Sequence, residues 1–260
     1  MSGAFASRGP EDGEPMDENA SRPPLARQEF IEWLRREGAS RYHDRHRYHV
    51  LMHDGKLTRP QLQQWVLNRY YYQTRIPIKD AILLSKSDDP AFRRMWIRRI
   101  QDHDGTAEGE GGLEMWLRLA EGVGLDREAV RSCRSVLPGV RFACDAYVEL
   151  VRERSLLEGV ASSLTEFFAP DLMSRRILAW ETHYPWVKPE MLAYFRARVP
   201  RARRDAEEAI DFVVVGATTY GLQERCVAAL VRKTEILWHL LDATYAAYVE
   251  PGWGPEGPRA

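Results

Sequence analysis

Side chains that could bind an anion recur at helical spacing along the chain. Arg69 and Gln73 are four residues apart with Tyr72 beside them, and Tyr194 and Arg198 repeat the same interval. Residues four apart share one face of a helix. An arginine, an amide and a phenol on one face suit a ligand that carries carboxylates on a flat ring. The alternative interpretation is an exposed helix face whose tyrosines are half-buried in packing.

Two other segments carry groups that could move or bind charge. His103 follows Arg99 by four residues and stands between two aspartates. It could therefore exchange protons near neutral pH, or it could act as a C-terminal cap that interacts with the helix dipole. Thr165 and Glu166 interrupt an apolar stretch. These two side chains could bind a ligand or could bond back to the helix backbone.

Lysine is rare, with 5 Lys against 32 Arg, so the position of each lysine is informative. Lys233 lies beside an apolar edge formed by Ile236, Leu237 and Leu240, which follow it by three, four and seven residues. A lysine on such an edge could extend its amine to solvent along the apolar surface. Alternatively, it is a partly desolvated cation that awaits an anion.

Four of the seven histidines, His43, His46, His49 and His53, fall in one short segment. On a helix, their intervals of three and four residues would be typical of metal ligands. However, no histidine in the chain has a glutamate three residues before it, so the paired Glu-x-x-His signature of di-iron bundles is missing. The sequence therefore predicts no metal site.

Composition argues against several classes of protein. The 37 basic and 38 acidic residues give a net charge of -1, whereas nucleic-acid-binding proteins usually carry a basic excess. No apolar run approaches the ~18 residues of a membrane span, and the acidic, Pro/Gly-rich N-terminus lacks the apolar core of a secretory signal. Cys133, Cys144 and Cys226 form no CxxC pair, so we expect a reducing, cytoplasmic location.

The segments that must position these groups have helical patterns. Apolar residues at spacings of three and four predict helices over 61–76, 90–103, 112–123, 138–154 and 224–249. Pro77 is expected to kink or break the first of these helices. No segment shows sustained period-2 alternation. We therefore expect an all-α chain with a single compact helical bundle at 26–250, and disordered polar tails at 1–25 and 251–260.

Several longer motifs occur in the order seen in the pyrroloquinoline-quinone synthase family. They are Tyr42-His43, NRYYYQ at 68–73, IPIKD at 76–80, RIQDHDG at 99–105, LPGVRFA at 137–143, SSLTE at 162–166, HYPW at 183–186, YFR at 194–196 and ILW at 236–238. The chain resembles that family over about residues 28 to 250. Because many motifs agree in register, this resemblance is far more specific than any single spacing.

The resemblance implies a fold like that of haem oxygenase and the thiaminase-type proteins, assembled as a homodimer. It implies that a polyanionic substrate, a bicyclic tricarboxylic precursor, undergoes ring closure and an overall eight-electron oxidation. Oxygen is the co-substrate, hydrogen peroxide is released and pyrroloquinoline quinone is the product. The family uses no metal or redox cofactor. Two alternatives remain open, namely a non-catalytic protein that binds and delivers the quinone, and a metal-dependent oxygenase of the same fold.

The resemblance also assigns residues position by position. It implies substrate binding by Arg69, Gln73, Lys79, Arg99, Tyr147, Thr165, Glu166, Arg176 and Lys233, and catalysis by His43, His103, Tyr194 and Arg198. In this assignment His103 is the general base, and Tyr194 and Arg198 stabilise developing negative charge on oxygen. One position departs from the family, which typically has a histidine where this chain has Met173. A thioether cannot transfer protons.

Overall fold

The computed structural model describes residues 22–250, 253–254 and 257–258. Over these residues the chain is almost entirely helical. The helices are α1 (Arg27–Arg41), η2 (His43–Arg45), α2 (Arg47–His53), α3 (Arg59–Ser85), α4 (Pro90–Asp104), α5 (Gly111–Gly122), α6 (Arg127–Arg131), α7 (Pro138–Glu153), α8 (Leu156–Ser162), η3 (Ser163–Phe167), α9 (Ala169–His183), η4 (Pro189–Leu192), α10 (Ala193–Gly216) and α11 (Tyr220–Tyr248), where η marks a 3₁₀ helix. Two-residue strands β1 (Trp253–Gly254) and β2 (Gly257–Pro258) pair antiparallel. The prediction of an all-α fold is confirmed.

The five predicted helices correspond to α3, α4, α5, α7 and α11, whose boundaries agree within four residues except at Pro77, whereas α1, α2, α6, α8, α9 and α10 were not predicted. The helix α3 continues through this proline for eight more residues, so the predicted break at Pro77 is wrong. Proline removes one backbone donor and crowds the preceding turn. Here Gln73 before the proline, and Lys79 and Leu83 after it, are buried. Packing of α3 against α4 and α7 therefore outweighs the local preference.

The starts of two helices follow from their cap residues. Thr58 caps α3, with its hydroxyl accepting from the Gln61 amide at 3.4 Å while the Gln61 side chain accepts from the Thr58 amide at 2.8 Å. Asp89 caps α4 by accepting from the amides of Ala91 and Phe92. Each cap satisfies amide groups that a helix N-terminus otherwise leaves unpaired.

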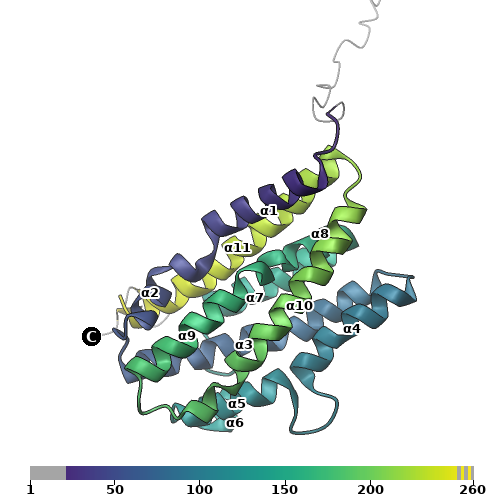
Figure 1. Cartoon of the computed structure of the whole chain (residues 1–260). Coiled ribbons are helices and arrows are strands. Elements are labelled where there is room, and N and C mark those ends of the chain that lie inside the picture. Colours follow the sequence, from purple (N-terminus) through teal and green to yellow (C-terminus); the bar gives the residue numbers. More distant parts are fainter. Residues whose placement is uncertain (1–21, 251–252, 255–256, 259–260) are drawn as a thin grey trace, which may run out of the picture.

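Long helices packed side by side make up the bundle (Figure 1). The helix α3 packs against α4 and α7, α10 packs against α9, and α11 packs against α1, α7 and α8. Before α1, the Arg22 guanidinium donates to the Tyr220 hydroxyl at 2.9 Å. The segment that precedes α1 is therefore hydrogen-bonded to the start of α11. Most of the two predicted tails, 1–25 and 251–260, lies outside the described residues. None of the described helices is long and apolar enough to cross a membrane.

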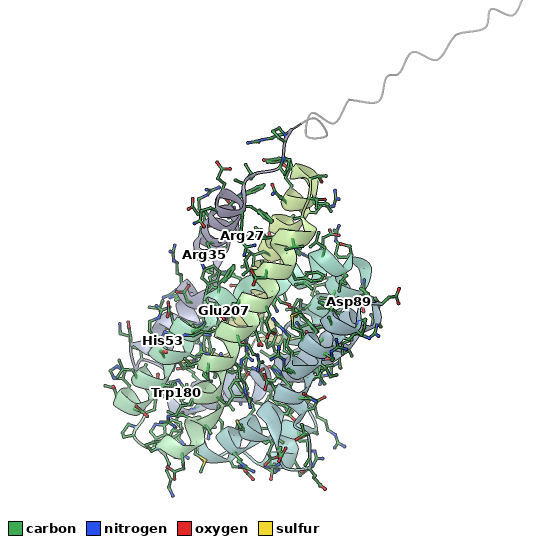
Figure 2. The ribbon with its side chains drawn as sticks, turned by 45° about the vertical axis from the view of Figure 1, so that its right-hand side comes forward. Arg27, Arg35, His53, Asp89, Trp180 and Glu207 are labelled. Carbon is green, nitrogen blue, oxygen red and sulfur yellow. The ribbon has the colours of Figure 1, made fainter. Side chains whose placement is uncertain are left out.

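An aromatic cluster at the centre of the bundle joins four helices. Trp65 of α3 lies 5.6 Å from Trp116 of α5 and 6.0 Å from Trp180 of α9, measured between ring centroids. Phe195 of α10 lies 5.5 Å from Trp180, and all four rings are buried. Trp180 is labelled in Figure 2, as is His53 of the neighbouring helix α2. The cluster fixes the helices that carry the polar groups described next.

Candidate active site

A cavity of about 60 Å³ lies between α3, α4, α9, α10 and the short η2 and η3 helices. Its wall includes nine of the predicted site residues, namely His43, Arg69, Gln73, His103, Thr165, Glu166, Arg176, Tyr194 and Arg198. A smaller void of about 10 Å³ shares several of these residues and adds Lys79, Arg99 and Tyr147. The last predicted residue, Lys233, bonds to Tyr72, which lines both voids. The structure therefore brings all the predicted residues together.

Two cations stack against tyrosine rings on one side of the site. The Arg69 guanidinium lies 3.9 Å from the Tyr72 ring centroid, and one of its terminal nitrogens is buried with no hydrogen-bond partner among the described residues. The Lys233 amine donates to the Tyr72 hydroxyl at 2.9 Å and lies 3.3 Å from the Tyr147 ring centroid. Lys233 is 1% exposed and does not extend to solvent. Burial, reinforced by the charges of Arg69 and Lys79, holds the pKa of Lys233 well below its usual range.

Lys79 has a different electrostatic environment from Lys233. Its amine lies 2.6 Å from an Asp80 carboxylate oxygen and donates to the Ser163 hydroxyl at 3.0 Å. Burial alone would lower the pKa of Lys79, but the charge and hydrogen bond of Asp80 together with Tyr147 outweigh burial, so the pKa is raised. The Trp96 indole donates to the same carboxylate at 2.8 Å. Lys79 is therefore a permanent cation with a fixed position.

The His103 imidazole is held in its neutral form. Its Nδ1 lies 3.0 Å from the Arg99 carbonyl oxygen. A carbonyl only accepts, so Nδ1 carries the proton and Nε2 carries the lone pair. Burial, followed by the charge of Arg198, lowers the pKa of His103 to about 4. The residue does lie in the last turn of α4, as the capping alternative requires, but its ring also lines the cavity.

Donor groups from α10 approach the same cavity. The Arg198 guanidinium donates to Glu166 at 2.7 Å through Nη2 and to Asp205 at 3.2 Å through Nη1. The Tyr194 hydroxyl donates to the Gln73 amide oxygen at 2.7 Å. Burial raises the pKa of Tyr194, so its phenol stays neutral and keeps its proton. The pairing of Glu166 with Arg198 favours the ligand-site interpretation of that segment over back-bonding to the helix.

The histidine segment positions an arginine. Arg176 donates from Nη2 to His49 Nε2 at 3.2 Å, and His49 Nδ1 in turn donates to the His43 carbonyl at 3.0 Å. Burial lowers the pKa of both His43 and His49. His46 caps α2, accepting at Nδ1 from the Tyr48 amide, so His43 and His46 do not share one helix. Among the described residues no three His, Cys, Asp or Glu side chains lie where they could hold a metal ion together.

Two further residues around the voids lie outside the predicted set of site residues. The more important is Asp205, which is 2% exposed and lies seven residues after Arg198 on the same helix. Tyr194, Arg198 and Asp205 therefore recur at intervals of four and seven, a spacing that places all three on one face. Met173 lines the cavity one helical turn before Arg176. The sequence identifies its type but not its contacts.

Comparison with known proteins gives consistent matches. The TENA/THI-4/PQQC family profile matches residues 33–243. The chain is 53% identical over 224 residues to the pyrroloquinoline-quinone synthase of Acidiphilium cryptum, covering 86% of this chain and 91% of that one. It is 52% identical over 231 residues to the synthase of Rhizobium meliloti, covering 89% and 90% of the two chains.

Solved structures share the fold at low sequence identity. A domain of unknown function with a heme oxygenase-like fold from Shewanella denitrificans gives a TM-score of 0.69 at 16% identity, over 86% of this chain and 94% of that one. A TenA homologue from Pseudomonas syringae gives 0.65 at 17% identity, over 90% and 98%. These likenesses confirm the expected haem-oxygenase-like fold. Together with the sequence matches, they show that the chain belongs to the TENA/THI-4/PQQC family and, within it, to the pyrroloquinoline-quinone synthases.

Proposed function

We propose that the protein catalyses the last step of pyrroloquinoline quinone biosynthesis. In this proposal it closes the second ring of a bicyclic tricarboxylic precursor and oxidises it by eight electrons overall, with O2 as the acceptor and hydrogen peroxide as a product. The relatives at about 50% identity carry the name of this enzyme over nearly the whole chain. The site supplies an independent argument from charge.

The charge around the two voids matches a tricarboxylate. Six cationic side chains and three carboxylates gather there, namely Arg69, Lys79, Arg99, Arg176, Arg198 and Lys233 against Asp80, Glu166 and Asp205. With Lys233 protonated, three positive charges remain in excess. Buried charges are tolerated only when they are compensated, and guanidinium groups pair well with carboxylates. A ligand with three carboxylates supplies the missing negative charge, and this observation carries the proposal.

Each two-electron oxidation then needs a base and a stabilised oxygen. A substrate C–H bond breaks, its proton passes to His103 Nε2, and the electron pair passes through the conjugated substrate to O2. Reduced oxygen takes up two protons and leaves as H2O2, so the substrate loses two hydrogens for each O2 reduced to peroxide. Arg198 and the neutral Tyr194 phenol stabilise the negative charge that develops on oxygen. We propose that no resident metal or redox cofactor takes part.

A second candidate function is binding and delivery of the finished quinone. Met173 favours it, because this thioether lines the cavity at a position where the family typically has a histidine. A metal-dependent oxygenase is a third possibility, and metal analysis of active, purified protein distinguishes it. Zinc, iron or copper at one equivalent, lost together with activity, would favour that alternative.

Single-turnover spectroscopy tests the proposal directly. The protein is mixed with the ring-open precursor without oxygen and is then exposed to O2. We expect the absorption of the finished quinone to appear together with O2 consumption and peroxide formation. Tight binding with a stalled spectrum after O2 would contradict synthase activity and favour the delivery function.

We further propose that the protein acts in the cytoplasm as a homodimer. Its three cysteines are free, which suits a reducing compartment. Sedimentation equilibrium at micromolar concentration should give twice the chain mass of 30.0 kDa. A single-chain mass across the accessible concentrations would contradict the dimer without affecting the proposed chemistry.

A further inference from the structure

Asp205 accepts hydrogen bonds from three arginines at the small void of the site. One of its carboxylate oxygens accepts from Arg198 at 3.2 Å, and the other accepts from Arg204 at 2.7 Å. Its backbone carbonyl accepts from Arg99 at 2.5 Å. Thus a single residue of α10 holds two site arginines, one from its own helix and one from α4. Its side chain is 2% exposed, so solvent does not compete for these contacts.

The two carboxylate partners of Arg198 differ in exposure. The Glu166 side chain is 26% exposed and lines the larger cavity, whereas Asp205 lines only the small inner void. An anion that enters the larger cavity therefore meets Glu166 and the outer edge of Arg198 first. The hydrogen bond between Arg198 and Asp205 remains in place when the anion replaces Glu166 at Arg198.

We propose that Asp205 is a positioning residue of this site: it anchors Arg198 and Arg99 while Glu166 gives up its contact with Arg198 to the incoming anion. This inference rests on the proposed function. Because the anchor holds the guanidinium plane before the ligand arrives, little reorganisation is needed when negative charge develops on oxygen. The residue acts through Arg198 and Arg99 and does not itself touch the reacting atoms.

The Asp205 carboxylate also contributes to the net charge around His103. The charged groups that line the small void together with this imidazole are Arg198 and Asp205 from α10, Glu166 from η3, Lys79 and Asp80 from α3, and Arg99 from its own helix α4; the charges of Arg198, Asp80 and Glu166 act on it directly. Removing the Asp205 charge leaves Arg198 less compensated, which disfavours imidazolium and lowers the pKa of His103 further. If the substitution at Asp205 only loosened the packing, the effect would be the opposite. Water that entered the site would then raise the pKa of His103 toward its usual value of about 6.5.

The test is Asp205→Asn, which keeps the shape and removes the charge. We expect kcat/KM to fall by about one to two orders of magnitude, with the circular dichroism spectrum retained. We also expect the affinity for the finished quinone to fall. The pKa of His103, followed by NMR of the imidazole, should shift downward.

Asp211→Asn is the matched control, because Asp211 lies on the same helix in an exposed ion pair with Arg27 and should change none of these readouts.

An unchanged kcat/KM with unchanged quinone affinity, or an upward shift of the His103 pKa, would overturn the inference. If Asp205→Asn does not fold, Asp205→Glu decides, since it keeps the charge and displaces Arg198 by one methylene. We then expect lower quinone affinity at an unchanged His103 pKa, and wild-type affinity and turnover would overturn the inference. The NMR and binding readouts need no turnover, so a wild type that binds quinone without making it refutes only the proposed function.

Discussion

At the scale of single residues, burial selects which groups are charged before a ligand arrives. His103 is 5% exposed and neutral, while Lys79 beside Asp80 stays charged at 2% exposure. Lys233 is equally buried, and its partners among the described residues are a phenol and two ring faces. The site thus combines a neutral imidazole, a fixed cation and a cation whose charge depends on its partner.

The protonation of His103 predicts the acid side of the pH profile. A base is active only when it is unprotonated, so activity is lost as the pH falls through its pKa of about 4. We expect kcat/KM to lose no activity to imidazole protonation above about pH 5, more than one pH unit below the usual histidine pKa. His103→Asn should keep quinone binding and abolish most turnover. Unchanged turnover in this variant would exclude His103 as the base.

Lys233 predicts proton uptake on binding. Carboxylates of the ligand raise the lowered pKa of Lys233, so between the free and bound pKa values each binding event takes up a proton. Calorimetry in buffers of different ionisation enthalpy measures this uptake. Lys233→Met should abolish it and weaken quinone binding by about 1.5–3 kcal/mol, the value of a charged hydrogen bond. The exposed Lys188 supplies the control Lys188→Met, which should leave both quantities unchanged.

Met173 predicts a gain of function. Met173→His places a proton-transferring side chain in the cavity wall near Arg176. We expect the oxygen-dependent phase of a single turnover to accelerate, while the anaerobic binding phase keeps its amplitude. Met173→Leu is the apolar control. Equal rates in all three proteins would show that proton transfer at this position does not limit the reaction.

Spacing along the sequence predicted which site residues share a helix face. The other site residues come together through contacts between helices. Arg69 with Gln73, and Tyr194 with Arg198, were found because an interval of four reports one helix face. Asp205 lies seven residues after Arg198 on the same face of α10, but its spacing does not show that it accepts from Arg198 or that its backbone carbonyl accepts from Arg99 of another helix. Hydrogen bonds between helices leave no periodic trace in a sequence.

At the scale of elements, α3 is the principal scaffold of the site. It carries Arg69, Gln73 and Lys79 over three turns and passes Pro77 without ending. The apolar pattern predicted its first part but not its continuation, because a sequence cannot show that α4 and α7 cover the later turns. The histidine segment is the reverse case, since regular spacing suggested one helix where the chain forms a 3₁₀ turn, a cap and a short helix.

The capping box of α3 predicts a stability effect that is separable from chemistry. Thr58→Ala removes the hydroxyl that accepts from the Gln61 amide. We expect a loss of about 1 kcal/mol, which for a domain of this size lowers Tm by about 2–4 °C. Thr182→Ala is the control, because its hydroxyl bonds back to the Leu178 carbonyl within α9 and caps nothing. A Tm unchanged in Thr58→Ala would show that tertiary packing alone fixes this helix start.

At the scale of the whole molecule, the balanced overall charge conceals a strongly basic interior site. The net charge is -1, yet the two voids carry an excess of three positive charges with Lys233 protonated. A cavity of about 60 Å³ has room for only a few ordered waters. We therefore expect lining side chains to move when the proposed quinone binds.

The proposal of a cofactor-free oxidase predicts the outcome of metal removal. Dialysis against a strong chelator, followed by elemental analysis, should leave kcat per chain unchanged at metal contents far below one equivalent. Re-addition of iron, copper or zinc should not raise it. Activity that follows metal content in proportion would contradict the proposed oxidation.

The aromatic cluster also has an optical consequence. Trp116 lines the cavity and lies 4.8 Å from Tyr194 and 5.6 Å from Trp65, measured between ring centroids. Because a conjugated quinone absorbs where buried indoles emit, a bound product should quench this emission by resonance energy transfer. The ring-open precursor is less conjugated and should quench it less. The intrinsic fluorescence of the core therefore follows oxidation of the ligand in real time, without an added label.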